Sequence, residues 1–205
     1  MGPTRIIPVF DVGNVLIRWD PRCLYRKLIA DEAEREDFLA RICPGDWNLE
    51  MDGGKPFAQG VEERVALFPD KADLIRAFDE RWVETLGGAV DGSVAILEEL
   101  QALGVPCYAI TNFNHEKFAL TTRHFPFLSS FHGIVVSGEE GVLKPDRRIY
   151  DLLCSRHGLA AEDCLFIDDS AANVEGARAA GMRAHHFSEP ALLRAELKAA
   201  GLPLA

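Results

Sequence analysis

The sequence of 205 residues predicts an α/β fold in which a parallel sheet is flanked by helices and a small all-helical unit is inserted after the first strand. Three observations lead to this prediction. Short apolar runs of β-forming residues recur along the chain, and several end in polar residues. From residue 91 onward these runs alternate with segments of helical spacing, which is typical of a parallel sheet with crossover helices. Residues 17–88, in contrast, show helical spacing and no strand pattern.

The first strand is expected at residues 6–10, where the sequence reads Ile-Ile-Pro-Val-Phe. A run without polar alternation is typical of a strand that is buried on both faces of a parallel sheet. This run leads directly into Asp11, and ligands of open α/β sheets bind outside the carboxyl ends of the strands. Asp11 is therefore placed for chemistry, although an aspartate at such a point can also simply cap a turn.

The remaining elements are predicted from apolar spacing and from the positions of Gly and Pro. Within the helical unit, residues 43–54 are rich in Gly and Pro, and we interpret them as a loop around Trp47. The elements expected after this unit are helices at 94–103, 115–124, 146–157, 171–180 and 191–200, and strands at 105–110, 133–136, 164–167 and 183–187.

Composition excludes several classes of function. The formal net charge of −10 argues against a nucleic acid partner, because phosphate binding needs a basic face. The five cysteines form no CxxC pair, which argues against a disulfide framework or a structural zinc site and indicates a reducing, cytoplasmic compartment. The chain shows neither a signal-like apolar region nor an apolar run of membrane-spanning length, so we expect no membrane partner.

Polar side chains follow several of the apolar runs, and a parallel sheet would gather them at one edge. They are Asp11, Gly13 and Asn14, then Thr111 and Asn112, then Lys144, then Asp168 and Asp169. Several carboxylates with water ligands suit Mg²⁺, and an amine with a hydroxyl suits a phosphoryl group. Each residue alone has a structural alternative, since carboxylates before a helix can cap it and a Thr at a strand end can belong to a turn.

Taken together, the motifs resemble those of the haloacid dehalogenase superfamily, which is best known for phosphatases with an aspartate nucleophile. They are, in order, Phe-Asp11-Val-Gly-Asn-Val-Leu, Ile-Thr111-Asn112, Gly-Val-Leu-Lys144-Pro with Tyr150 after it, and Phe-Ile-Asp168-Asp169-Ser-Ala-Ala-Asn173-Val-Glu-Gly-Ala. The resemblance covers the whole chain. It implies a Rossmann-like catalytic core at residues 1–16 and 89–205 and a helical cap at 17–88, as in subfamily I.

The resemblance also implies a mechanism. Asp11 would attack phosphorus and form an aspartyl-phosphate, which water then hydrolyses. Thr111 and Lys144 would stabilise the negative charge of the transferring group, and Lys144 would pair with Asp11 and the second acidic cluster in the absence of substrate. The metal ligands implied for Mg²⁺ are Asp11, the carbonyl of Gly13, Asp168 and Asp169, with Asn173 orienting an acidic side chain.

Substrate-binding residues are expected at Gly13, Asn14, Asn112, Lys144 and Trp47. Trp47 could cover a substrate, and it could equally belong to the interior of the cap. The substrate is expected to be a small phosphorylated metabolite, and the protein a monomer or a homodimer.

One position departs from the common pattern of the superfamily. Most of its phosphatases have Asp two residues after the nucleophile, where it protonates the leaving oxygen, and this chain has Gly13. General acid–base help contributes about 10²–10⁴-fold to such reactions, so its loss should slow the hydrolysis of poor leaving groups unless a cap residue or a bound water replaces it. The Asp-x-Gly-Asn pattern is similar to that of a branch that includes sugar-phosphate phosphatases of the glucose-1-phosphate type.

Two alternative functions remain open. A 2-haloacid dehalogenase uses the same nucleophile on carbon without a metal, but Asp168 and Asp169 would then place uncompensated negative charge beside Asp11. A binding protein with weak or no turnover is the other alternative, and Gly13 is its only support. Dependence of hydrolysis on Mg²⁺ would separate a phosphatase from a dehalogenase.

Overall fold

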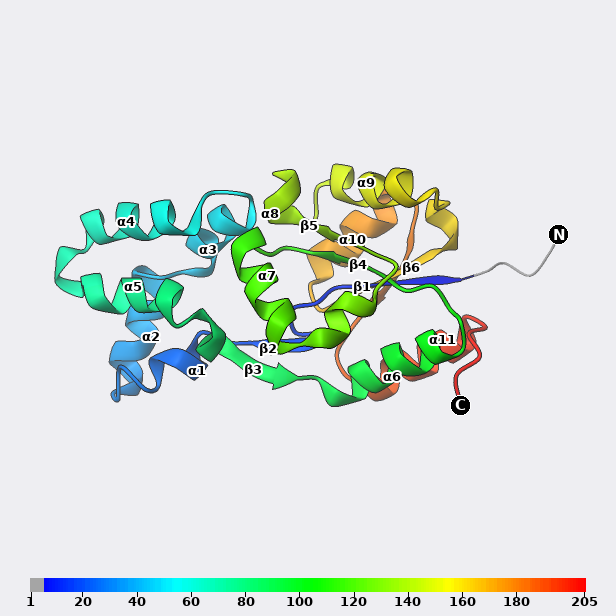
Figure 1. Cartoon of the computed structure of the whole chain (residues 1–205), viewed down its shortest axis with the longest axis horizontal. Coiled ribbons are helices and arrows are strands. Elements are labelled where there is room, and N and C mark those ends of the chain that lie inside the picture. The colour runs from blue at the N-terminus through cyan, green and yellow to red at the C-terminus, as the bar shows by residue number, and fades with distance from the viewer. Residues whose placement is uncertain (1–5) are drawn as a thin grey trace.

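A computed structural model describes residues 6–205 of the chain and shows a five-stranded parallel sheet with the strand order β5-β4-β1-β6-β7 (Figure 1). The strands are β1 (Ile7–Phe10), β4 (Tyr108–Thr111), β5 (Gly133–Val136), β6 (Cys164–Asp168) and β7 (Arg183–His186). Residues 1–5 of the predicted core lie outside the described residues. The first strand, β1, is the central one, and it is buried as its uninterrupted apolar sequence predicts.

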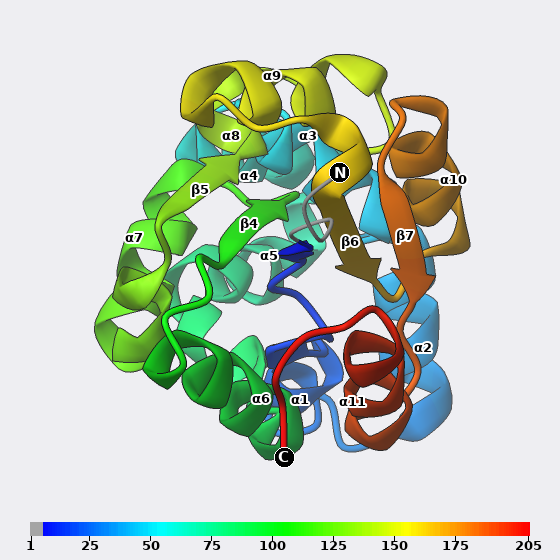
Figure 2. The same cartoon turned by 90° about the vertical axis from the view of Figure 1, so that its right-hand side faces the viewer.

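Helices cover both faces of this sheet (Figure 2). One face is covered by α6 (Asp91–Ala102) and α11 (Pro190–Ala199), and the other by α9 (Arg147–His157) and α10 (Ala171–Ala179). Along β1, Val9 packs with the α9 and α10 layer and Phe10 with the α6 and α11 layer, and neither side chain is exposed. The predicted α/β fold is confirmed.

The chain order places a topological switch point at β1. From β1 the chain continues to β4 and β5 on one side of the sheet and then crosses to β6 and β7 on the other side. Ligands bind at such points, outside the carboxyl ends of the strands. The ends of β1, β4 and β6 are therefore the place to look for a site.

A second unit, between β1 and α6, lies at one end of the molecule (Figure 1). Its helices are α1 (Arg22–Tyr25), α2 (Glu32–Arg41), α3 (Gly45–Asp52), α4 (Phe57–Leu67) and α5 (Ala72–Glu80). Their apolar faces enclose a core of their own, in which the rings of Tyr25, Phe57, Phe78 and Trp82 contact one another at centroid distances of 5.5–6.4 Å. Such edge-to-face and offset contacts are favourable for aromatic rings.

Two predictions for this unit are wrong. Residues 17–88 include strand residues, because β2 (Ile17–Trp19) and β3 (Leu86–Ala89) pair in an antiparallel ribbon that joins the unit to the core. Both strands are short and β3 contains two glycines, so neither shows an alternating pattern. Residues 43–54 are mostly helix α3 rather than loop, because Pro44 and Gly53 stand just outside its two ends. Pro is tolerated at a helix start and Gly favoured after a helix end, so they delimit a helix here.

Other elements agree more closely with their predicted bounds. Helix α7 (His115–His124) and strand β5 coincide with the predicted ranges, and Asn114 caps α7 by accepting from the backbone N–H groups of Glu116 and Lys117. The short helix α8 (Ser137–Glu140) was not predicted. Within residues 6–205, we find no helix with the length and apolar character that a membrane crossing requires.

Candidate active site

Asp11 lies at the carboxyl end of the central strand and is 6% exposed. Its backbone N–H donates to the carbonyl of Ile167 in β6 at 2.8 Å, and its Oδ1 accepts from the N–H of Val12 at 2.7 Å. The chain then turns sharply at Asn14, which has a φ of 56°. Asn tolerates this left-handed conformation better than most residues. Its Oδ1 accepts from the N–H of Trp19, which ties the turn to β2.

Lys144 joins the two acidic positions of the site. Its Nζ lies 2.7 Å from Asp11 Oδ1 and 2.7 Å from Asp168 Oδ2, and it also donates to the carbonyl of Ile110. The pairing that the resemblance implied for Lys144 is thus present. Burial alone would lower the pKa of this ammonium, but the carboxylates of Asp11 and Asp168 outweigh burial, so that its pKa is raised.

Burial also dominates the titration of the carboxyl groups. It raises the pKa of Asp11 to about 7; Lys144 opposes this shift and the negative charge of Asp168 adds to it. The pKa of Asp169 is raised by burial and by its neighbour Asp168. Burial is the first cause of both shifts, and in Asp11 it outweighs the positive charge of Lys144. A bound cation would add to that positive charge.

Oxygen atoms from Asp11, Asp168 and Asp169 all lie within 4.8 Å of one another. The carboxylate of Asp168 is held by Asn173 Nδ2, at 3.1 Å from each of its oxygens, and by the N–H of Ser170 at 2.8 Å. A compact set of hard oxygen donors with an orienting amide is the donor set that Mg²⁺ prefers. These residues therefore fit a magnesium ion.

Thr111 and Asn112 follow β4 and have different surroundings. The Thr111 side chain is buried, and its Oγ1 has no hydrogen-bond partner among residues 6–205. The Asn112 side chain donates to the carbonyl of Lys144 at 3.0 Å and accepts from its N–H at 2.8 Å. Asn112 thus fixes the backbone that carries Lys144, and the Thr111 hydroxyl is left without a partner among the described residues.

A pocket of about 260 Å³ is lined by Asp11, Asn112 and Asp169, whereas Thr111, Lys144 and Asp168 are not among its lining residues. Its lining combines polar residues of the core with residues of the helical unit, and the lining residues are Asp11, Gly13, Asn14, Trp19, Gly45, Asn48, Leu49, Asp52, Trp82, Asn112, Phe113 and Asp169. A Cβ atom built on Gly13 would have no heavy atom within 4 Å outside its immediate chain neighbours. The position that lacks an acid in this chain therefore borders open space.

Asp52 was missed by sequence reasoning. It is the last residue of α3 and is 6% exposed, and it borders the same pocket as Asp11. Its Oδ1 accepts from the N–H of Asn114 and its Oδ2 from Asn48 Nδ2, both at 2.8 Å. The Asn48-to-Asp52 spacing of four residues is a helical signal, but it was lost because residues 43–54 were interpreted as a loop.

The structure places Trp47 away from this pocket. Its side chain is buried inside the helical unit, where Nε1 donates to the carbonyl of Gly60 at 3.2 Å. The centroids of its ring and the Phe78 ring are 5.3 Å apart. The interpretation of Trp47 as a substrate-binding residue is corrected: Trp19 and Trp82 line the pocket instead. Trp47 and Trp82 both lie in helix-rich sequence, so the sequence could not distinguish them.

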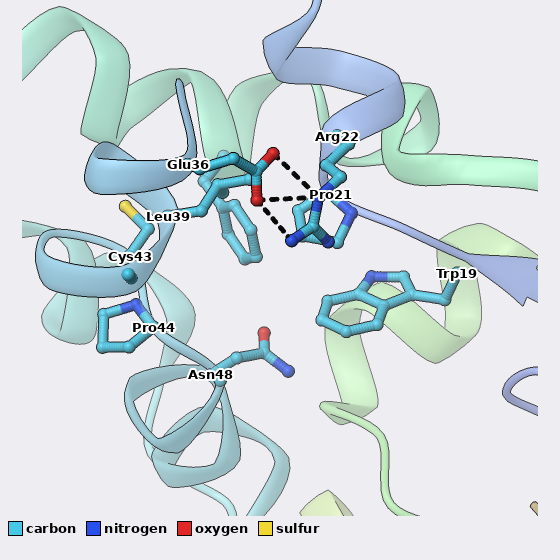
Figure 3. A pocket seen from close by; sticks show the side chains of 11 residues that line it. Trp19, Pro21, Arg22, Glu36, Leu39, Cys43, Pro44 and Asn48 are labelled. Atoms are coloured by element: carbon cyan, nitrogen blue, oxygen red, sulfur yellow. Dashed lines mark hydrogen bonds and ion pairs between the residues drawn. The ribbon is translucent and has the colours of Figure 1, made fainter. Parts of the chain in front are cut away.

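A second cavity of about 260 Å³ adjoins the first, since both have Trp19, Gly45 and Asn48 in their walls. Figure 3 shows the Asn48 amide and the Trp19 indole facing this cavity. The ion pair between Arg22 and Glu36 borders it as well (Figure 3). The space available next to the acidic cluster therefore extends into the helical unit.

Comparison with known proteins identifies the family of the chain. The sequence model of the haloacid dehalogenase-like hydrolase family matches residues 9–181, and the chain belongs to this family. It is therefore a hydrolase. The matched range contains all the core residues discussed above, from Asp11 to Asn173.

Individual relatives are more distant. A sesquiterpene phosphatase of Aspergillus oryzae is 27% identical over 198 residues, covering 93% of each chain. A phosphatase of Mycobacterium tuberculosis is 37% identical over 90 residues, which are 43% of this chain and 42% of that protein. A haloacid dehalogenase-family enzyme of Bacteroides thetaiotaomicron, crystallised with magnesium and inorganic phosphate, is 22% identical with a TM-score of 0.70, covering 90% of this chain and 94% of that one.

Proposed function

We propose that this hydrolase is a magnesium-dependent phosphatase that cleaves a small phosphate monoester through an aspartyl-phosphate on Asp11. The observation that carries the proposal is that the carboxylates of Asp11 and Asp168, at the carboxyl ends of β1 and β6, both contact the buried ammonium of Lys144. Two relatives named as phosphatases and a structural neighbour that holds magnesium and phosphate support it.

The residues of the site have separate roles in this reaction. Asp11 attacks phosphorus in line with the ester bond, and water later attacks the resulting acyl phosphate. Lys144 and the free hydroxyl of Thr111 stabilise the negative charge on the transferring phosphoryl group. Because Lys144 is already held by Asp168 and by the Asn112 clamp on its backbone, little reorganisation is needed during the reaction.

Asp11, Asp168, Asp169 and the carbonyl of Gly13 would hold the Mg²⁺ ion, which neutralises phosphoryl oxygens when it is bound. Asn173 orients Asp168 for this task. We also propose that residues 17–88 act as the cap of this enzyme over a core formed by 1–16 and 89–205, because α3 supplies part of the pocket wall.

The pocket walls favour a phosphate ester with an apolar organic group. Trp19, Trp82 and Phe113 face the space beside the acidic cluster, and an apolar group buried there gains about 25 cal/mol per Å². Sugar hydroxyls beside these rings would have to exchange their hydrogen bonds to water for bonds to the polar residues that also line the pocket, such as Asn14, Asn48 and Asn112. The sesquiterpene phosphatase relative supports the apolar class. The glucose-1-phosphate type of substrate, suggested by the Asp-x-Gly-Asn pattern, stays a prediction.

The test is phosphate release from a sugar 1-phosphate, a short prenyl phosphate and an aryl phosphate, each with Mg²⁺ and with a chelator. We expect Mg²⁺-dependent release that is lost in Asp11→Asn, with the prenyl ester preferred over the sugar ester. Halide release from 2-haloacids in the presence of chelator would overturn the proposal in favour of a dehalogenase. Phosphate binding without release from any ester would favour a binding protein.

A further inference from the structure

The proposed reaction requires two proton transfers that the residues assigned so far do not perform. The leaving alcohol must gain a proton when the ester bond breaks, and the attacking water must lose one. Three carboxyl groups border the pocket, namely Asp11, Asp52 and Asp169. Asp11 forms the bond to phosphorus and Asp169 belongs to the acidic cluster, so Asp52 is the carboxyl group without a role.

We propose that Asp52, at the end of helix α3 in the cap, is the proton donor and acceptor of this active site. The inference rests on the proposed phosphatase function and adds a catalytic residue to it. Asp52 takes the place of the acid that the common pattern of the superfamily has at the position of Gly13. In this chain the group would come from the cap rather than from the loop after β1.

The surroundings of Asp52 hold its carboxyl group in a fixed position. Asn114 at the start of α7 and Asn48 in α3 each donate one hydrogen bond to it. The backbone beside it is held as well, since the hydroxyl of Ser137 donates to the Asp52 carbonyl and Asn114 Nδ2 donates to the Met51 carbonyl. Preorganisation of this kind is needed for a group that must meet a reacting atom.

The electrostatics of the pocket also suit proton exchange. Burial raises the pKa of Asp52 to about 7, the N–H of Asn114 opposes this shift, Asp11 adds to it, and Lys144 opposes it. A pKa close to the working pH lets a carboxyl group be either acid or base with a small cost. Asp11 and Lys144 are the charged groups of the core that act on this pKa, and Asp169 borders the same pocket. Near pH 7 both forms of Asp52 would therefore be present, including the protonated form that the first step uses.

Each step balances with Asp52 in this role. In the first, an Asp11 oxygen forms a bond to phosphorus, the ester P–O bond breaks with its electron pair on the leaving oxygen, and the Asp52 proton passes to that oxygen. In the second, water attacks phosphorus, its proton passes to the Asp52 carboxylate, and the bond between phosphorus and Asp11 breaks. Alcohol and inorganic phosphate leave, and both side chains return to their initial states.

The experiment compares two esters in Asp52→Asn. The Asn side chain keeps an acceptor for the Asn114 N–H and has nearly the shape of Asp. We expect kcat for an alkyl phosphate to fall about 10²–10⁴-fold, with a much smaller loss for p-nitrophenyl phosphate, whose leaving group needs no proton. The part of the pH dependence of kcat that reflects the titration of Asp52 should disappear. Glu50→Gln, which changes an exposed carboxylate in the same helix, is the matched control.

A second variant keeps the test valid if Asp52→Asn also disturbs the cap. Gly13→Asp adds a carboxyl group where a Cβ meets no neighbour within 4 Å. Combined with Asp52→Asn, it should restore part of the activity on the alkyl ester, which a merely structural role of Asp52 would not allow. The inference would be overturned if Asp52→Asn lowered kcat equally for both esters and Gly13→Asp restored none of the activity. An inactive wild-type enzyme on every ester would instead overturn the proposed function.

Discussion

Lys144 Nζ lies 2.7 Å from Asp11 Oδ1, and the side chain of Lys144 is 1% exposed. The same nitrogen lies 2.7 Å from Asp168 Oδ2, so that one buried ammonium joins the ends of the two neighbouring strands β1 and β6. Removing one partner from a buried charge group leaves the others uncompensated, and this is more costly than the loss of an exposed ion pair. Lys144 therefore contributes to both folding and chemistry.

Lys144→Met should abolish phosphate release and lower the free energy of unfolding at pH 7.5 by about 3 kcal/mol, because two buried carboxylates lose their counter-charge. The loss should be smaller at pH 5, because burial raises the pKa of Asp11 to about 7 and its carboxyl group takes up a proton below that pH. Urea unfolding at both pH values measures the change. Arg41→Met, which removes an exposed pair with Asp37, is the control and should alter stability by less than about 0.5 kcal/mol. Equal stability of Lys144→Met and wild type would contradict this view of the site.

Asn173→Ala removes the amide that holds both oxygens of Asp168. If Asp168 is a magnesium ligand, the Mg²⁺ concentration that gives half-maximal activity should rise about 10–100-fold, since residues that orient ligands contribute that much to affinity. Titration of activity with Mg²⁺ after chelator treatment measures this. Glu175→Gln, an exposed change in the same helix, should leave the titration unchanged. An unaltered titration in Asn173→Ala would show that Asp168 needs no such support.

Gly176→Ala tests the close packing of α10 against the segment that follows Lys144. A Cβ atom at this position would lie 2.6 Å from the carbonyl oxygen of Pro145 and 2.7 Å from its Cβ. The backbone must shift to make room, at a cost of about 1–3 kcal/mol. We expect a lower midpoint of thermal unfolding together with a lower kcat, because the shift reaches Lys144. A variant with wild-type kcat would show that the packing can relax without moving the site.

The pH dependence of stability should reveal the buried carboxyl group of Asp52. In the unfolded chain its pKa is about 4, and burial raises it to about 7 in the folded chain. Between these values the folded protein binds the extra proton, so this group lowers stability as pH rises through the window. Asp52→Asn lacks this contribution. The free energy of unfolding of the variant, relative to wild type, should increase from pH 4 to pH 7 and then level off.

Denaturant unfolding of both proteins at half-unit pH steps measures the difference. The Glu50→Gln variant should follow the wild-type curve. A constant difference between Asp52→Asn and wild type across this range would mean that Asp52 titrates alike in the folded and unfolded chains.

Much of the fold and site could be predicted because the signals are local. The apolar run before Asp11 specifies a buried strand, and a parallel sheet brings the ends of β1, β4 and β6 together without further information. The position of Asp11, Thr111 and Asp168 at one edge of the sheet follows from that rule alone. Helix α7 was predicted with its observed bounds because apolar spacing marks its length and Asn114 caps its start.

Other features depend on contacts that are distant in sequence. Strands β2 and β3 are stable only as a pair, and residues about 70 positions apart form that pair, as Ile17 and Ala89 do. Helix α3 was hidden because Gly and Pro mark either a loop or the ends of a helix, and packing decides between them. Trp47 and Trp82 could not be distinguished because both are apolar and lie in helix-rich sequence.

By itself, the sequence determined the α/β core and the positions of Asp11, Lys144 and the acidic pair in it, since each occupies the end of an apolar run or the start of a helix. Only the tertiary structure decided which residues of the helical unit reach that cluster. Asp52 borders the pocket because Asn114, 62 positions later, binds its carboxylate. Its pKa is raised because the folded chain excludes water from it, a property that no local stretch of sequence carries.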